Sequence, residues 1–328
     1  MTHLTYLEAA VVGLIQGVSE LFPVSSLGHN VLIPALIGGS WARDLNVSTP
    51  ESPYLAFIVG MHVATAIALL IYFWRDWIRI IGGFFSSIRH IRVETVNERL
   101  AWMLILATIP VGIVGLLFEH AFRVLFGKPI LAAVFLIVNG LILFSGERFR
   151  PRSSMEADEA IAAQRERALS EGRQGAGRHA SGQQAVRQEE MTLAVQADQR
   201  LSTMGIWRAL LIGATQILAL FAGISRDGIT MVTGMARGLS REDAARFAFP
   251  LATPVILAAG VLKIPDLMGP LGKGIHGQIL LGSVLSGLGA YVSVRFLVKY
   301  FQTRTLTPFA IYCIVFGLGS VIYLGVVK

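Results

Sequence analysis

The stretch QGVSELFPVSSLGHN, from Gln16 to Asn30, places a carboxylate, an imidazole, three serine hydroxyls and a proline inside an apolar part of the chain. The apolar segment around it, Leu4 to Ile37, is long enough to enter a bilayer, but its proline and glycines oppose one straight helix. Irregular backbone at membrane depth is tolerated only where protein or water satisfies its amides and carbonyls. The stretch therefore predicts a broken helix that faces a polar cavity.

The composition of the whole chain indicates an integral membrane protein. Hydrophobic residues make up 54% of its 328 residues, charged residues only 15%, and the mean hydropathy is +0.62. Several segments approach the roughly 20 apolar residues that a helix needs to cross a bilayer, and they lack the alternation of membrane strands. We predict an all-α protein with six spans, at Tyr54–Trp74, Leu100–Phe118, Pro129–Ser145, Phe247–Leu262, Gly277–Val298 and Thr307–Val327.

A second apolar stretch, Trp207 to Met235, is broken in the same way as the first. The sequence GLIQGVSELFPVSSLG from Gly13 aligns without gaps on GATQILALFAGISRDG, 200 residues later. The matched pairs are Gly13 with Gly213, Gln16 with Gln216, Ser25 with Ser225 and Gly28 with Gly228. We predict two re-entrant helical hairpins, residues 4–37 and 207–235, in an inverted-topology repeat whose shared site lies near the bilayer midplane.

A polar segment of residues 147–206 separates a first half, 1–145, from a second half, 207–328. It holds nine Arg and nine Asp or Glu residues. We predict a solvated cytoplasmic loop that is partly a surface helix and partly disordered, with no catalytic role. The two halves are expected to form one polytopic membrane domain over residues 1–328.

Basic residues indicate the orientation in the membrane. Nineteen Lys and Arg residues fall in segments assigned to one side, and six fall on the other. The basic-rich segments are residues 75–99, 146–206, 237–246 and 299–306. The positive-inside rule places these in the cytoplasm and both termini outside. The shared site is expected to open outward. Because the basic residues lie between spans, the net charge of +7 does not indicate nucleic acid.

Three charged or amide side chains are predicted to meet at the breaks. Gln16 and Glu20 are four residues apart and share a helix face, while Arg226 comes from the second hairpin. An arginine in the bilayer costs about 2.5–3.5 kcal/mol on insertion scales and needs an anionic partner. That partner is either a phosphate, which the Gly-Ser turn GISRDG at a helix start also favours, or a permanent pair with Glu20 or Asp227.

Two hydroxyls and two imidazoles could complete the site. Ser25 or Ser26 could act as a nucleophile beside Glu20 or His29, with His29 as an acid, or it could cap the half-helix after Pro23. His62 is expected to line the pocket. Hydrogen bonding between helices is the alternative for His62, as it is for other polar residues in the spans.

These residues resemble the motifs of the bacterial undecaprenyl-diphosphate phosphatases of the bacitracin-resistance family. The first family motif reads Glu or Gln, three residues, Glu, then Pro-x-Ser-Ser-x-Gly-His, and it matches Gln16–His29. The second, Pro-Gly-x-Ser-Arg-Ser-Gly, matches Ala222–Gly228 except at Ala222 and Asp227. The likeness covers nearly the whole chain outside the polar loop, including FWRDW at 73–77 and PFAIY at 308–312.

The resemblance implies an enzyme of the bacterial inner membrane that removes the terminal phosphate of undecaprenyl diphosphate. The product, undecaprenyl phosphate, is the carrier that peptidoglycan synthesis reuses, and this activity confers bacitracin resistance. The residues carried over as catalytic are Glu20, Ser26, His29 and Arg226. The expected substrate-binding residues are Gln16, Ser25, Ser225, Gly223, Gly228 and His62.

The resemblance also implies a divalent cation, Mg²⁺ or Ca²⁺. Glu20 and Asp227 are its expected ligands, because hard cations prefer carboxylate and phosphate oxygens. Asp227 would then replace the carboxylate that is missing at Gln16. The alternative is that Asp227 caps a helix or pairs with Arg226.

A polyprenyl-phosphate flippase is the main alternative function, because inverted repeats with broken helices also build transporters. It would use the same phosphate site. Apart from the lipid substrate and membrane lipids, the expected partner is a second copy of the chain. The row Gly282, Ser286 and Ala290 offers a smooth helix face for close packing, either inside one chain or in a homodimer.

Overall fold

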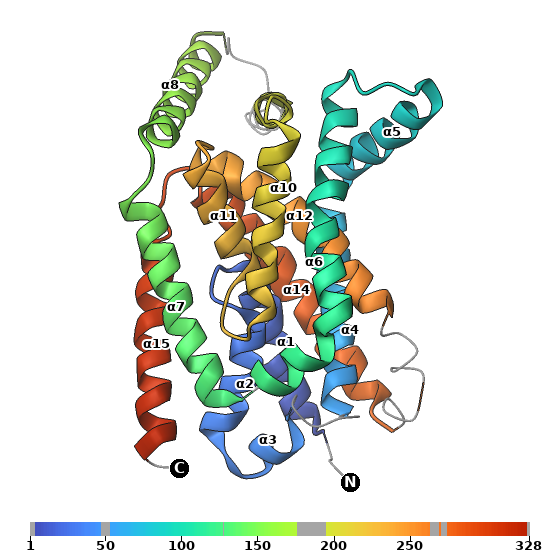
Figure 1. The fold of residues 1–328 in the computed structure, drawn as a ribbon, viewed down its shortest axis with the longest axis vertical. Helices are drawn as coiled ribbons and strands as arrows, with labels where there is room; N and C mark the ends of the chain where they lie inside the picture. Colours follow the sequence, from blue (N-terminus) through green and yellow to red (C-terminus); the bar gives the residue numbers. More distant parts are fainter. Residues whose placement is uncertain are drawn as a thin grey trace.

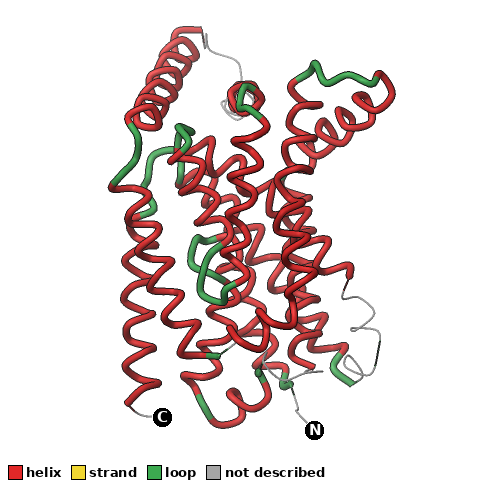
Figure 2. Tube along the Cα trace, in the orientation of Figure 1, coloured by secondary structure: helices red, strands yellow, loops and turns green. Residues whose placement is uncertain are grey.

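The computed structural model describes residues 4–46, 53–126, 128–175, 195–262, 269 and 274–326. These residues form a bundle of helices that run mostly along the long axis of the molecule (Figure 1), and they contain no strand (Figure 2). The helices are α1 (Tyr6–Leu21), α2 (Ser26–Ile37), α3 (Gly39–Asp44), α4 (Pro53–Tyr72), α5 (Trp74–His90), α6 (Val96–Phe126), α7 (Pro129–Arg148), α8 (Arg152–Gly175), Val195–Ser202, α10 (Ile206–Ala214), the 3₁₀ helix η1 (Thr215–Leu220), α11 (Arg226–Ala236), α12 (Arg241–Leu262), α14 (His276–Tyr300) and α15 (Thr307–Val326).

Five of these helices are long and apolar enough to cross a membrane. They are Val96–Phe118 within α6, α7, α12, α14 and α15, and they match five of the predicted spans. The sixth predicted span, Tyr54–Trp74, falls on α4, in which the side chains at positions 53, 55, 56 and 59 lie outside the described residues. A bent pair, Val195–Ser202 with Ile206–Leu220, passes the same test together but turns by 99°. The chain is a multi-pass membrane protein.

The two broken stretches form helix–break–helix units whose breaks are in contact. α1 ends at Leu21, because Phe22 precedes a proline and is extended, and α2 begins after Ser25. In the second unit η1 leads to a break at residues 221–225, and α11 follows. The backbone N–H of Gly223 donates a hydrogen bond to Ser25 Oγ at 3.1 Å. Figure 2 shows loops enclosed by helices midway along the molecule, where the breaks lie.

The two breaks have matching caps at Ser25 and Ser225, one of the residue pairs aligned in the predicted repeat. Ser25 Oγ accepts from the Gly28 N–H at 3.2 Å, and Ser225 Oγ accepts from the Gly228 N–H at the same distance. The helices before the breaks differ, because α1 is α-helical to its end whereas the last turns before Phe221 are a 3₁₀ helix. Re-entrance and the inverted orientation of the two halves stay predictions.

The row of small residues on α14 packs inside the chain. A Cβ at Gly13 of α1 would lie 2.8 Å from Gly282 Cα, and one at Gly17 would lie 2.9 Å from Ser286 Cα. Such close backbones are the usual result of small residues at a membrane helix interface. This face is therefore buried against α1, and it is not available to a second copy of the chain.

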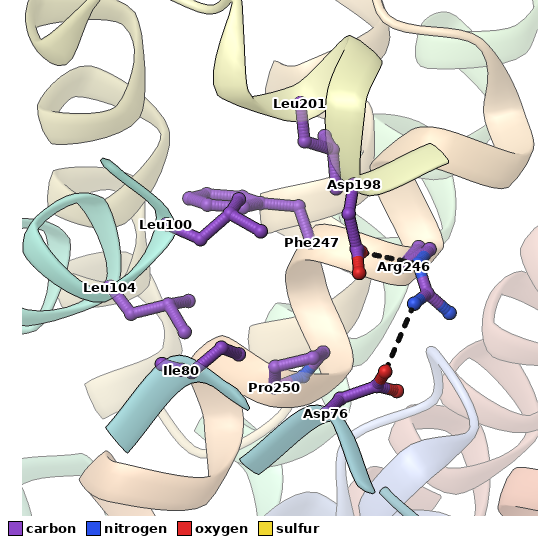
Figure 3. A pocket seen from close by; sticks show the side chains of 9 residues that line it. All are labelled: Asp76, Ile80, Leu100, Leu104, Asp198, Leu201, Arg246, Phe247 and Pro250. Atoms are coloured by element: carbon purple, nitrogen blue, oxygen red, sulfur yellow. Dashed lines mark hydrogen bonds and ion pairs between the residues drawn. The ribbon is translucent and has the colours of Figure 1, made fainter. Parts of the chain in front are cut away.

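The polar segment between the halves is only partly a loop. α8 is a helix on the outside of the bundle (Figure 1), and residues 176–194 lie outside the described residues. The helix Val195–Ser202 instead packs against the bundle, with Leu201 buried. Asp198 accepts from Arg246 at 2.9 Å and from Arg79 at 3.1 Å, beside a small cavity of about 20 Å³ (Figure 3). The helix Val195–Ser202 therefore differs from the predicted solvated loop, because Asp198 is buried and forms ion pairs with arginines of two other helices.

The basic-rich segments lie together in space. Residues 75–99, 237–246 and 299–306, with α8 and the helix Val195–Ser202, are at one end of the bundle in Figure 1. α1 begins and α15 ends at the opposite end. The described termini and the basic segments are thus on opposite sides, as expected from the charge count.

Candidate functional site

The carboxylate of Glu20 is the centre of a buried hydrogen-bond cluster that joins both breaks. It lies in the last turn of α1. Its Oε2 accepts a hydrogen bond from Gln16 Nε2 at 2.7 Å and another from Ser26 Oγ. Its Oε1 accepts from Arg226 Nη2 at 2.8 Å. The structure therefore brings together the glutamine, glutamate, serine and arginine that the sequence assigned to one site.

His62 of α4 joins this cluster from the side. Its Nε2 lies 3.6 Å from Glu20 Oε2 and 3.4 Å from Gln16 Nε2. Its Nδ1 lies 2.9 Å from the carbonyl oxygen of Ile58, one helical turn earlier, which fixes the ring orientation. About a quarter of the His62 side chain is exposed, whereas that of Glu20 is nearly inaccessible. His62 thus lies at the accessible edge of the cluster.

Ser25 holds the two breaks together, although it is adjacent to Ser26. Its Oγ accepts hydrogen bonds from two backbone amides, those of Gly28 and Gly223. Its φ of +67° lies in a region that side chains rarely adopt, and such strain persists only where surrounding contacts hold it. Gly223, with φ of +114°, requires the freedom of glycine. Ser26 is therefore the serine beside the carboxylate.

The side chain of Asn139, on α7, is hydrogen-bonded to both breaks. Its Nδ2 donates to the Pro23 carbonyl at 3.0 Å, and its Oδ1 accepts from the Ser225 N–H at 2.9 Å. The sequence left two uses open for this residue, lining the pocket or hydrogen bonding between helices. A fully buried amide in an apolar span was the available signal, but its partners are 116 and 86 residues away.

Replacement of Asn139 by alanine is expected to destabilise the fold by about 1–3 kcal/mol, because it leaves a buried carbonyl and a buried amide without a partner. Phosphate release should fall as well, since the two breaks lose their shared contact. Thermal unfolding in detergent measures the first effect. Asn139→Asp, which loses the donor to Pro23 and adds a buried carboxylate, should cost at least as much as Asn139→Ala. Equal stability of all three proteins would contradict this role.

His29 lies on the other side of the first break, against α15. Its Nδ1 is 2.7 Å from the Ser25 carbonyl oxygen, and its Nε2 is 2.7 Å from the Tyr312 hydroxyl. The ring stacks on those of Tyr312 and Phe316. Both ring nitrogens therefore have partners other than Glu20. Tyr312, part of PFAIY, was not expected at the site.

Asn30, the last residue of the quoted stretch, also belongs to the site. Its Nδ2 donates to Gln16 Oε1 at 2.5 Å. This bond orients the Gln16 amide so that its nitrogen points to Glu20. Because Asn30 comes from α2 and Gln16 from α1, the contact also joins the two helices of the first broken unit.

Asp227 pairs with Arg226, as one alternative predicted, and it does not cap the helix. Its side chain is buried in the first turn of α11, which Ser225 caps instead. Oδ1 lies 3.6 Å from Arg226 Nε, and within the described part of the chain neither carboxylate oxygen has a hydrogen-bond partner. Arg226 is thus between two carboxylates, those of Glu20 and Asp227.

This donor set fits a hard divalent cation that is held partly by substrate. Among the described residues there is no group of three or more His, Cys, Asp and Glu side chains placed to hold a metal ion. Mg²⁺ is commonly bound through one or two carboxylates plus phosphate oxygens and water, so a complete protein cage is not required. The oxygens of Asp227 accept no hydrogen bond among the described residues, although Oδ1 lies 3.6 Å from Arg226 Nε.

Comparison with known proteins gives the same family as the two sequence motifs around Glu20 and Arg226. The family model for the bacitracin resistance protein BacA matches residues 9–319. A protein of Mycolicibacterium paratuberculosis named undecaprenyl-diphosphatase is 58% identical over 323 residues, which are 98% of both chains. One of Mycobacterium avium with the same name is 57% identical, again over 98% of both chains, and undecaprenyl-diphosphatase 2 of Frankia alni is 51% identical over 97% of both.

These matches cover both broken stretches and the helices between them. The chain belongs to the bacitracin resistance protein BacA family.

Proposed function

We propose that this protein hydrolyses undecaprenyl diphosphate to undecaprenyl phosphate and inorganic phosphate, which recycles the carrier lipid for peptidoglycan synthesis and confers bacitracin resistance. The observation that carries the proposal is the contact of Glu20 with both Ser26 and Arg226. A carboxylate, a hydroxyl and a guanidinium within hydrogen-bond reach are a base, a nucleophile and a phosphate ligand.

In the proposed reaction Arg226 leaves Glu20 and binds the terminal phosphate with its planar fork of donors. Glu20 then accepts the proton of Ser26, and the serine oxygen forms a bond to the outer phosphorus as the bond to the bridging oxygen breaks. Undecaprenyl phosphate leaves, and water hydrolyses the phosphoserine. In the alternative form of this mechanism a water molecule replaces the serine as nucleophile, and Glu20 accepts its proton.

The other residues of the site hold these groups in place. Gln16 donates to Glu20, and His62 lies at the accessible edge, where it can contact the diphosphate. The amides of Gly223, Ser225 and Gly228 have partners in this structure and stabilise the turn that carries Arg226. Substrate contact by these three residues, and proton donation by His29, stay predictions.

Phosphate release from undecaprenyl diphosphate by the purified protein tests the activity. The same assay on undecaprenyl phosphate is the control, since that lipid has no anhydride bond. A protein that binds the diphosphate lipid and releases no phosphate would be a flippase or a binding protein. Acid quenching during turnover tests the nucleophile, with phosphoserine expected at residue 26 and absent from Ser26→Ala. Activity that survives in Ser26→Ala would assign the attack to water.

The proposed cation, Mg²⁺ or Ca²⁺, has Glu20 and Asp227 as its protein ligands. When bound, it neutralises negative charge on the diphosphate. The buried oxygens of Asp227 without hydrogen-bond partners support this assignment. Asp227 would then provide the carboxylate that Gln16 cannot provide.

Replacement of Asp227 by serine is expected to raise the Mg²⁺ concentration for half-maximal activity by about tenfold, a size known for the loss of groups that support a metal site. Binding of Mn²⁺ to the purified protein, followed by electron paramagnetic resonance, should weaken in parallel. Asp243→Asn, which changes a buried aspartate outside the site, is the control. Unchanged metal dependence and Mn²⁺ binding in Asp227→Ser would limit Asp227 to its pairing with Arg226.

We further propose an inner-membrane location with both termini outside the cytoplasm and a site that opens outward from near the midplane. The separation of basic segments from the described termini supports this orientation. Labelling of Cys introduced at exposed Arg152 of α8 in intact cells and in lysed cells tests it. Reaction only after lysis is expected. A homodimer, which the sequence left open, would use a surface other than the small-residue face of α14.

A further inference from the structure

Helix α5 is fixed to the bundle by one face only. Figure 1 shows it inclined to the spans beside the start of α6, at the end that carries the basic segments. Trp102 of α6 donates to Ser87 at 3.0 Å, and Ser86 donates to Glu98 at 2.8 Å. At the start of α5, Arg246 lies 3.4 Å from Asp76 (Figure 3). These contacts set the rotation of α5 about its own axis.

The opposite face of α5 is a row of exposed apolar side chains. Its members, here called the apolar row, are Trp74, Ile78, Ile81, Phe85 and Ile88. Steps of four and three residues place them on one side of a helix. Ile78 is 62% exposed and Phe85 64% exposed. Ile67 and Ile71 at the end of α4 are also exposed, and with Trp74 they keep the same spacing of four and three residues.

Basic side chains follow one edge of this row. Arg75 and Arg89 are exposed on α5, and Arg92 is exposed in the turn after it. Arg75 lies over the ring of Trp74, 5.1 Å from its centre, and Arg92 is 3.7 Å from exposed Glu94. An apolar face with an arginine-rich edge is the pattern of a helix that lies in a membrane interface.

We infer that α5 lies in the lipid–water interface, with the apolar row among the acyl chains, and that Arg75, Arg89 and Arg92 bind the phosphate headgroups of anionic phospholipids. The exposed apolar residues Ile67 and Ile71 of α4, which falls in a predicted span, favour lipid as the occupant. The positive edge favours anionic headgroups over zwitterionic ones, since each basic residue near such a surface adds to the attraction. This surface is separate from the phosphate site and does not depend on catalysis.

Nitroxide labels on full-length protein in lipid nanodiscs test the position of α5. Labels at Ile81→Cys and Phe85→Cys, in a Cys313→Ala background, should collide readily with oxygen and poorly with a water-soluble nickel complex. Labels at Gly82→Cys and Arg89→Cys, toward the basic edge, should show the reverse. Equal access of the nickel complex to both sets would overturn the proposal. Low access of both reagents to the apolar row would also overturn it, because protein would then cover the row.

The lipid retained by purified protein tests the headgroup assignment. Nanodiscs contain phosphatidylcholine and phosphatidylglycerol, and mass spectrometry measures the two lipids that remain bound after detergent extraction. Combined replacement of Arg75, Arg89 and Arg92 by glutamine should lower the enrichment of phosphatidylglycerol at least about fivefold, the effect of one arginine at an anionic surface. Arg152→Gln on α8 is the control. Enrichment that is unchanged in the triple variant would contradict the assignment.

Discussion

Replacement of Glu20 by glutamine is expected to lower kcat/KM for phosphate release by about 10²–10⁴-fold, the usual contribution of a general base. Glutamine has nearly the same shape and can still bond Gln16 or Arg226, but it cannot accept the proton of Ser26. The change therefore tests the charge and basicity of this residue more than its packing. Kinetics on purified protein in detergent, with undecaprenyl diphosphate as substrate, measure the effect.

Ser19→Ala is the matched control for Glu20→Gln. Ser19 is buried on the same helix, and its hydroxyl donates a hydrogen bond to the backbone carbonyl of Ile15, away from the site. Its activity should stay close to that of the wild type. Glu20→Gln should unfold cooperatively on heating, as the wild type does, so that its loss of activity is not a loss of the fold. Activity within about twofold of the wild type in Glu20→Gln would show that another group is the base, since removal of a general base costs far more.

Replacement of Arg226 by lysine is expected to lower kcat/KM by about 10³-fold or more, as the loss of an arginine that stabilises transferring phosphoryl groups does in other enzymes. Lysine keeps the positive charge but presents no planar fork to two phosphate oxygens. The loss reflects weaker binding of the phosphate in the transition state by lysine than by arginine. Steady-state kinetics over a range of lipid concentrations measure it.

Arg237→Lys, at the other end of α11, is the control and should have little effect. The charge-only explanation of Arg226 predicts that lysine restores most of the activity lost in Arg226→Ala. If Arg226→Lys works as well as the wild type, the arginine serves the resting ion pair with Glu20 and not the phosphate.

The sequence was sufficient to predict the main contacts of the site. Gln16 and Glu20 were placed together because a helix repeats every 3.6 residues, and they are hydrogen-bonded. Arg226 was assigned an anionic partner because a charge in the bilayer is costly, and Glu20 is that partner in this structure. The first inference succeeds because helix geometry depends only on nearby residues. The second succeeds because the desolvation free energy of one charge is large enough to require a partner.

The contacts that the sequence did not predict join residues far apart in the chain. Tyr312 meets His29 across 283 positions, and Asn139 reaches both breaks. Tyr312 does not stand out in its segment, and the polar side chain of Asn139 stands out but does not indicate its partners. The packing of Asp198 against Arg246 was missed for the same reason. Partners of this kind depend on how helices are arranged, which periodicity alone does not specify.

The central claim is that Glu20 of the first break and Arg226 of the second act on one phosphate. A double-mutant cycle of kcat/KM for phosphate release, with Glu20→Gln, Arg226→Lys and the double variant, tests this claim most directly. Residues that act as a unit are strongly non-additive, so we expect the double variant to fall within about tenfold of the worse single variant. Losses that simply multiply would mean that the two residues serve independent sites and would contradict the account.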